Sequence, residues 1–146
     1  MADIFSIVGS SLDAQGSRMD AIASNLANAD SIAAPGTAPY RAHEVVFEAA
    51  PVGPTSDDGT GSSDPAANDP GVQVLGTVLS NAPPNMTYDP NSPYANAQGY
   101  VTGSNVSSVS QMVDLIDSSN SYSASVAVLQ QADRVDQQIL SSFQVS

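Results

Sequence analysis

Few side chains in this 146-residue sequence could carry out acid–base or nucleophilic chemistry. The one histidine, His43, lies between Arg41 and Glu44 in a stretch with the composition of a β-strand, and there is no cysteine. A general base needs a defined partner and a pocket, and the sequence indicates neither. The lack of cysteine excludes thiolate catalysis, cysteine zinc sites and disulfides. We therefore interpret His43 as a half-exposed strand residue and expect no enzyme.

A group of four aspartates suggests calcium binding as a second chemistry. The group consists of Asp57, Asp58, Asp64 and Asp69. It lacks the Asp-x-Asp-x-Asp-Gly run and the later bidentate glutamate of the twelve-residue calcium loop. We interpret it as a solvated charged loop, and we expect no metal, no cofactor and no small-molecule substrate.

The charge of the chain is strongly one-sided. Fifteen acidic residues stand against three arginines, there is no lysine, and the formal net charge is -12. Such a chain cannot neutralise a run of phosphates, which argues against nucleic acid and anionic membrane surfaces as partners. No stretch approaches the about 20 apolar residues that cross a bilayer. The short apolar run from Ile4 to Val8 follows Asp3 rather than a basic residue, so we expect no cleavable signal peptide.

Proline and glycine divide the chain into two helical ends and a non-helical middle. All ten prolines lie between Pro35 and Pro93, and neither residue occurs after Gly103. In a helix interior proline costs about 3 kcal/mol and glycine about 1 kcal/mol. We predict an α+β fold with a terminal helical domain, residues 1–30 and 104–146, and an inserted β-rich module, residues 31–103. Strand composition marks residues 40–50 and 72–79, and the Pro-, Gly- and Asp-rich segment 51–70 predicts a flexible loop.

Apolar residues recur at spacings of three and four in both ends, which is typical of helices that pair as a coiled coil. The stripe in the first helix consists of Phe5, Val8, Leu12, Met19, Ile22 and Leu26, with the polar Gln15 among them. The stripe in the last helix consists of Tyr122, Val126, Leu129, Leu140 and Phe143, with Asp133 and Asp136 among them, and is extended toward its start by Val109, Met112 and Ile116.

A second apolar stripe follows the other side of the last helix. It consists of Val128, Val135 and Ile139, together with Ala124 and Ala132. Positions 126 and 128 point about 200° apart on a helix, and a helix that is apolar on two faces needs two partners. A single long helix in the same chain supplies one partner. The pattern therefore favours helices that also pack against other subunits over an ordinary helical hairpin.

The intervening module returns the chain, so we predict that the two helices run antiparallel. We expect a register in which Arg18 lies near Asp133, although a slip by one heptad would keep the same spacing. The expected pairs are Phe5 with Phe143, Val8 with Leu140, Met19 with Leu129, Ile22 with Val126, Leu26 with Tyr122, and Gln15 with Asp133.

Four stretches resemble the flagellar rod and hook proteins of bacteria. The end of the first helix, Ala23-Ser24-Asn25-Leu26-Ala27-Asn28-Ala29-Asp30-Ser31, is similar to their A-S-N-[IL]-A-N-x-[DN]-[TS] signature. The other three are similar to the proximal-rod proteins of this family: Pro39-Tyr40-Arg41-Ala42, then Tyr88 to Ala95 with Gly99-Tyr100-Val101, then Asn105-Val106 with Gln111-Met112-Val113 and Ser121 to Ala124. Ser104, Gln111, Asn120 and Ser125 stand where the family usually has Pro, Glu, Arg and Asn. Any helix-surface pair at 111 and 120 is therefore not ionic here.

The resemblance implies a structural subunit of the flagellar basal-body rod, in its proximal part, that serves motility. Such proteins are exported unfolded by the flagellar type III apparatus without a cleavable signal, and they cross the periplasm as the rod. Their terminal helices form a coiled-coil domain along the axis, with the middle module outside. The implied partners are copies of the same chain, other rod proteins and the export apparatus. Two alternatives stay open: another rod or hook component, or a soluble coiled-coil adaptor that binds one partner helix in a groove.

Overall fold

The structure is a computed structural model that describes residues 2–51 and 70–143. The described chain has a helix at each end and, between them in sequence, two small antiparallel sheets. The predicted α+β class is therefore confirmed. The four aspartates considered for calcium and most of the predicted loop lie outside the described residues. The elements are α1 (Ala2–Ala27), β1 (His43–Pro51), β2 (Pro70–Leu79), β3 (Met86–Tyr88), β4 (Tyr100–Thr102) and α2 (Ser108–Phe143).

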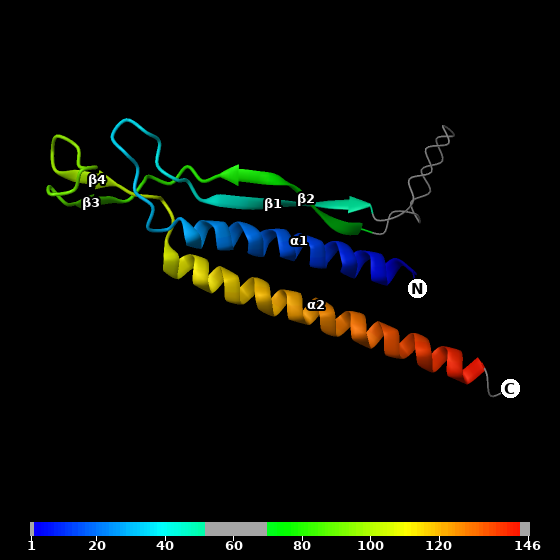
Figure 1. Cartoon of the computed structure of the whole chain (residues 1–146). Helices are drawn as coiled ribbons and strands as arrows, with labels where there is room; N and C mark the ends of the chain where they lie inside the picture. The colour runs from blue at the N-terminus through cyan, green and yellow to red at the C-terminus, as the bar shows by residue number, and fades with distance from the viewer. Residues whose placement is uncertain (1, 52–69, 144–146) are drawn as a thin grey trace, which may run out of the picture.

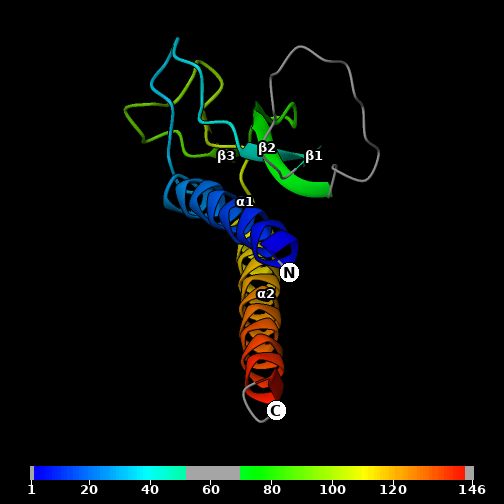
Figure 2. The same cartoon turned by 90° about the vertical axis from the view of Figure 1, so that its right-hand side faces the viewer.

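The main body has three layers, with α1 in the middle (Figure 1). The β1–β2 hairpin lies along one side of α1 and α2 lies along the other. The amide of Val72 in β2 donates a hydrogen bond to the Ser10 hydroxyl of α1 at 3.1 Å. Figure 2, a view nearly along the helices, shows that the axes of α1 and α2 diverge. Neither described helix is long and apolar enough to cross a membrane.

The end of α1 is fixed by side chains of the segment Ala23 to Ser31, which resembles the flagellar rod signature and is called the rod-like motif below. Asn28 Nδ2 donates to the Ser24 carbonyl at 2.9 Å, and the Ser31 hydroxyl donates to the Asn28 carbonyl at 2.8 Å. The last carbonyls of a helix have no intrahelical partner and need such donors. The helix therefore stops where the sequence predicted its end.

The β1–β2 hairpin contains one β-bulge. Its strands pair from His43 with Leu79 to Pro51 with Pro70, and the register shifts between Val46 and Phe47. The shift leaves Leu75 without an opposite residue, and Leu75 is 65% exposed. A bulge of this kind bends and twists a hairpin. Both predicted strands are confirmed, with the first beginning three residues later than expected.

The second sheet lies at the far end of the molecule and depends on Gly99. Strands β3 and β4 pair from Met86 with Thr102 to Tyr88 with Tyr100, and the two tyrosine rings meet edge to face with centroids 5.2 Å apart. Gly99 has a φ of 80°, and a Cβ there would lie 2.9 Å from Tyr88 Cε2. These two short strands lie within the predicted β-rich module, but outside the two stretches that strand composition marked.

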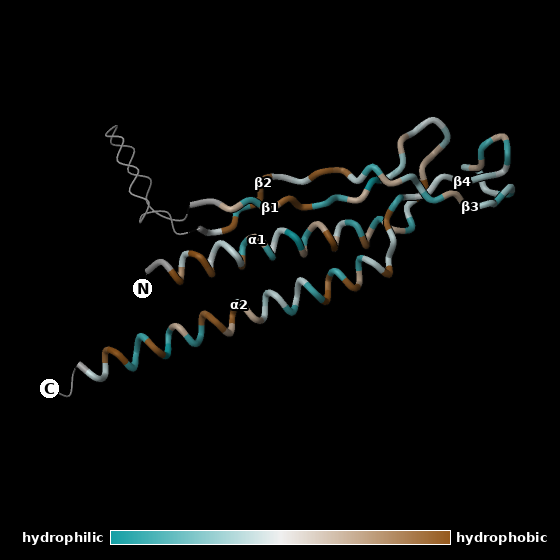
Figure 3. Tube along the Cα trace, turned by 180° about the vertical axis from the view of Figure 1, so that it is seen from behind, coloured by the Kyte–Doolittle hydropathy of each residue, from teal (hydrophilic) through white to brown (hydrophobic). Residues whose placement is uncertain are grey.

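The buried apolar core is small and centres on α1. It contains Val8, Ala14 and Ile22 of α1, together with Ala42, Val101 and Val106. Among the predicted packing residues, Phe5, Leu12, Met19, Leu26, Val126 and Leu129 are half-buried. The exposed ones are Val109, Met112, Ile116, Tyr122, Val128, Val135, Ile139 and Leu140. Figure 3 shows hydrophobic positions along the whole of α2, including the part that extends past the beginning of α1.

The helix register predicted from the heptads is wrong by about two heptads. Gln15 meets Ser118 rather than Asp133, which is a displacement of 15 residues, or about 22 Å along a helix. Because a heptad pattern repeats, it matches itself after each slip of seven residues. The register is instead set by polar contacts that hold the first turns of α2 beside the end of α1. Contacts run in opposite order along the two helices, since Asn25 of α1 meets Gln111 of α2.

Candidate assembly site at the helix junction

Asn25 joins three parts of the fold through one side-chain amide. The residue is only 2% exposed. Its Nδ2 donates to the His43 carbonyl at 2.9 Å and to Gln111 Oε1 at 3.0 Å. Its Oδ1 accepts from the His43 amide at 2.8 Å and from the Tyr40 hydroxyl at 3.1 Å. These four bonds use the full capacity of the amide. We call this group, Asn25, Tyr40, His43 and Gln111, the junction.

The one histidine of the chain is part of the junction. Tyr40 Oη lies 2.8 Å from His43 Nδ1 and 3.1 Å from the hydroxyl of Ser24. A phenol carries one hydrogen, and the Asn25 oxygen can only accept, so the Tyr40 hydrogen goes to Asn25. We therefore assign the ring hydrogen to His43 Nδ1, which donates to Tyr40. His43 is half-buried at the start of β1, as predicted, and its Nδ1 holds a structural contact.

A second set of polar contacts fixes the segment that leads into α2. Ser104 is buried; its hydroxyl donates to the Ala29 carbonyl at 2.8 Å and its amide donates to the Ser31 carbonyl at 3.1 Å. The next residue, Asn105, accepts from the Ala42 amide through Oδ1 at 2.7 Å. Residues that are far apart in sequence are thereby fixed beside the end of α1. This is why α2 begins where α1 ends.

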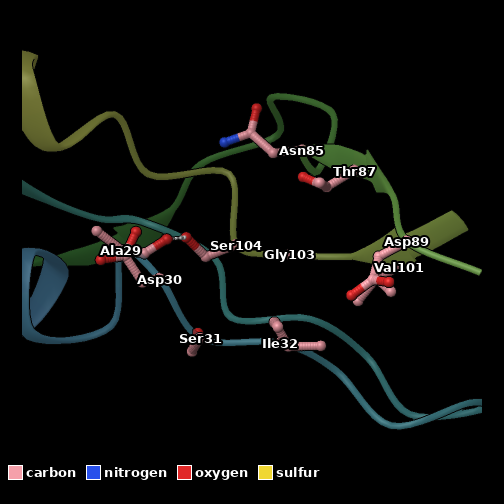
Figure 4. A pocket seen from close by; sticks show the side chains of 10 residues that line it. All are labelled: Ala29, Asp30, Ser31, Ile32, Asn85, Thr87, Asp89, Val101, Gly103 and Ser104. Atoms are coloured by element: carbon pink, nitrogen blue, oxygen red, sulfur yellow. Dashed lines mark hydrogen bonds between the residues drawn. The ribbon is translucent and has the colours of Figure 1, made fainter. Parts of the chain in front are cut away.

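A pocket of about 270 Å³ with a mixed polar and apolar lining lies beside the contact of Ser104 with Ala29 and Ser31 (Figure 4). Asn85 and Thr87 lie on one side of the chain segment through Gly103 and Ser104, and Ser31 and Ile32 lie on the other. The lining residues are Ala29, Asp30, Ser31, Ile32, Asn85, Thr87, Asp89, Val101, Gly103 and Ser104. They include no histidine and no cation. Within residues 2–51 and 70–143, no three His, Asp or Glu side chains are grouped to hold a metal ion.

Two contacts connect α1 and α2 farther along. The hydroxyl of Ser118, which is fully buried, donates to Gln15 Oε1 at 3.0 Å. Arg18 lies 3.9 Å from Asp114, so the predicted pairing of Arg18 with Asp133 is wrong. Both members of this ion pair are partly exposed, and such a pair contributes at most about 1 kcal/mol. A buried polar pair in a helix interface favours one register over its slipped alternatives.

Comparison with the sequences of known proteins places this chain in a family. Residues 97–142, which include β4 and most of α2, match the family model of the C-terminal region of flagellar basal-body rod FlgEFG proteins. The chain is 42% identical over 129 residues to flagellar basal-body rod protein FlgC of Escherichia coli O6:H1, covering 88% of this chain and 87% of the relative. Identity and coverage are the same for FlgC of Salmonella typhimurium. FlgC of Bacillus subtilis is 35% identical over 127 residues, covering 84% and 85%. The chain belongs to the FlgC family.

Membership of the FlgC family makes the chain a structural subunit of the flagellar basal-body rod. The junction explains part of the rod-like motif, Ser24 to Asp30, in physical terms. Ser24, Asn25 and Asn28 make the hydrogen bonds that end α1 and attach it to its neighbours. Leu26 is half-buried, the carbonyl of Ala29 accepts from Ser104, and Ala27 and Asp30 are exposed. Gln111 accepts a neutral hydrogen bond at the position where the FlgC-like pattern has Glu.

Three residues of the second stripe of α2, Val128, Ala132 and Val135, line an apolar groove of about 300 Å³ together with Ile4 and Phe5 of α1. Val128 and Val135 are still 49% and 42% exposed, so the packing of this stripe against other subunits stays a prediction. By contrast, Val109 and Ile116, which were expected to extend the α1-facing stripe, are 74% and 62% exposed. Val109 points about 180° away from Ser118 around the helix.

Proposed function

We propose that this chain builds the proximal part of the flagellar rod and that it assembles through its two terminal helices. The observation that carries the proposal is the amount of apolar surface on α2 that its own chain leaves uncovered. Helix α2 has 36 residues and α1 has 26. Exposed apolar residues lie near both ends of α2 and on different sides of it, as Val109 and Leu140 illustrate. Helices depend on burial of their apolar faces for most of their stability.

The proposal also assigns different roles to two parts of the chain. In this proposal residues 1–30 and 104–146 form an antiparallel coiled-coil domain, and residues 31–103 form a separate module. The opposite order of the contacts along α1 and α2, and the heptad spacing, support the coiled coil. The predicted packing residues then contact either the partner helix or neighbouring subunits. A soluble adaptor needs one open seam, whereas α2 leaves apolar residues uncovered on more than one side.

The proposal also includes how the chain is exported to the rod. The chain passes the flagellar type III export apparatus unfolded and spans the periplasm together with other rod proteins. Helices that gain much of their burial from neighbouring subunits are suited to this route, because they fold fully only on assembly. In this role the chain performs no catalysis.

Deletion of the gene in the bacterium that encodes this chain tests the proposal. We expect non-motile cells, and we expect electron micrographs of purified basal bodies to lack the cell-proximal part of the rod. The intact gene on a plasmid should restore both. A matched variant, Asp20→Asn, changes an exposed residue of α1 and should complement fully. Motile deletion cells, or basal bodies that lack only a distal segment, would contradict the proposal.

A further inference from the structure

We propose that one copy of this chain docks onto the next through two different surfaces, one on α2 alone and one formed by α2 and the start of α1, in a head-to-tail arrangement. The first surface, the ridge, consists of Val109, Met112, Val113 and Ile116. The second, the groove, is lined by Ile4, Phe5, Val128, Gln131, Ala132 and Val135. In this arrangement the ridge of one copy enters the groove of its neighbour. The inference rests on the proposed function, which requires copies of the chain to meet, and it specifies the surfaces involved.

The ridge is an apolar surface that the described residues leave open. Its four side chains are each more than half exposed. Their positions span an arc of only about 100° around the helix. Gln111 and Ser118, which bond to α1, lie on the opposite side of α2. Burial of an exposed aliphatic side chain contributes about 1.5–3 kcal/mol, so an uncovered row of four favours association.

The groove continues an interface that already exists within the chain. It lies where α1 begins, and Gln131 is its one polar lining residue. Helix α2 runs on past it to Phe143, whereas the described part of α1 starts at Ala2. Ile139, beyond the groove, is still 39% exposed. The apolar surface of α2 is therefore longer than the part that the described α1 covers.

Charge complementarity selects a second copy as the occupant. In a chain of net charge -12, Arg18 is paired with Asp114, and Arg41 donates to the carbonyls of Leu79 and Ser80. Arg134 lies exposed beside the groove, and within the described residues it has no ion-pair partner. Exposed Asp117 follows the ridge directly.

The register of the docked copies follows from matching the centres of the two surfaces. With Val113 of one copy opposite Ala132 of the other, Arg134 lies level with Leu115, within one turn of Asp117. The two copies are then displaced by 19 residues along α2, which is about 28 Å. Because ridge and groove are different surfaces, each copy keeps one of them free for a further copy. Contacts of this type extend into an open helical assembly rather than closing into a dimer.

Cysteine cross-linking of the full-length chain tests the arrangement, because the native sequence contains no cysteine. We expect Val113→Cys and Ala132→Cys, expressed as two separate chains in the deletion strain, to form disulfide-linked dimers in purified basal bodies. A disulfide requires Cα atoms within about 7 Å. Each variant alone should give no dimer. As a matched control, Asp20→Cys replaces an exposed residue of α1 and should not cross-link to Val113→Cys.

Four results would overturn the inference. Dimers from Val113→Cys alone would indicate a symmetric interface, and dimers with the control would indicate random collision. Absence of the expected dimer in basal bodies that contain both chains would exclude the contact, and cross-links to another rod protein would identify a different occupant. The proposed function fails separately: it falls if the native chain does not restore the cell-proximal rod, whatever the cross-links show.

Charge reversal tests the same contact without depending on cysteine chemistry. Arg134→Asp or Asp117→Arg should lower the cross-linking yield about fivefold, the effect of an exposed ion pair of about 1 kcal/mol. The chain with both changes should regain the native yield. Recovery is the decisive readout, because a variant that simply folds poorly would not be rescued by a second change. Failure of the double variant to recover, with normal amounts of protein in the basal bodies, would overturn the pairing.

Discussion

Replacement of Gly99 by alanine should destabilise the β3–β4 part of the molecule by about 2–3 kcal/mol. The φ of 80° at this position costs an L-residue about 1–2 kcal/mol. The new Cβ would also lie 2.9 Å from Tyr88 Cε2 and 3.3 Å from Pro90 Cβ, closer than the about 3.5–4.0 Å of optimal carbon contacts. Displacement of the Tyr88 ring would weaken its edge contact with Tyr100, which is worth about 0.5–1.5 kcal/mol.

Alanine substitutions at two other glycines distinguish the backbone contribution to the loss of stability from the steric contribution. Gly36 has a φ of 83° but open space at its Cβ, so Gly36→Ala should cost only the backbone part, about 1–2 kcal/mol. Gly76 has neither constraint, and Gly76→Ala should change stability by less than about 0.5 kcal/mol.

Urea unfolding of the full chain, followed by tyrosine fluorescence, measures the three variants. The chain has no tryptophan, and three of its five tyrosines, Tyr88, Tyr94 and Tyr100, lie in or beside this sheet. If Gly99→Ala costs no more than Gly36→Ala, the clash with Tyr88 is not real. If both match Gly76→Ala, the positive φ angles are wrong as well.

The remaining predictions concern the helices and the junction. Asn25→Ala removes four hydrogen bonds and leaves buried groups unpaired, which should cost about 3 kcal/mol; we expect swarming on soft agar to fail at a normal transcript level, and native swarming would contradict this. Ser104→Pro, the residue usual in the family, removes two hydrogen bonds to the end of α1 and should lower the urea midpoint; an unchanged midpoint would show that they contribute little. Gln15→Cys with Ser118→Cys should form a disulfide within one chain in intact rods, and its failure there would reject the register. Circular dichroism of the dilute purified chain should show much less helix than α1 and α2 contain, because the isolated helices are weak; near-complete helix at micromolar concentration would refute this.

The elements could be predicted from the sequence because they depend on local properties. Proline and glycine exclude helix from the middle of the chain, and their absence after Gly103 leaves α2 uninterrupted. Strand composition was sufficient for β1 and β2. It was insufficient for the three-residue strands β3 and β4, which depend on the turn at Gly99 and on the pairing of Tyr88 with Tyr100.

The pairing of the helices could not be predicted because several registers bury similar amounts of apolar surface. What distinguishes them is the burial of particular polar groups, which no periodicity reveals. Gln15 counted as an interruption of an apolar stripe, whereas it is the acceptor for buried Ser118. The resemblance singled out Asn25 as a motif residue, but its four hydrogen bonds go to three residues elsewhere in the chain, Tyr40, His43 and Gln111. Gln111 appeared in the sequence only as a departure from the family pattern, and the structure makes it one of those partners.

The crossing, where Ser104 passes beside Ala29 and Ser31, also determines where the protein can tolerate inserted residues. The chain leaves α1 at Ala27 and re-enters helix at Ser108, and Ser104 bonds directly to Ala29 across this gap. The spacing between α1 and α2 is therefore set by the few residues at the crossing and not by the length of chain between them. A fluorescent or affinity tag inserted at the Asp89–Asn91 turn would lengthen the loop without moving the helices apart. A longer segment at this place would leave the pair of helices and their exposed surfaces unchanged, so growth of the chain between the helices does not alter their spacing.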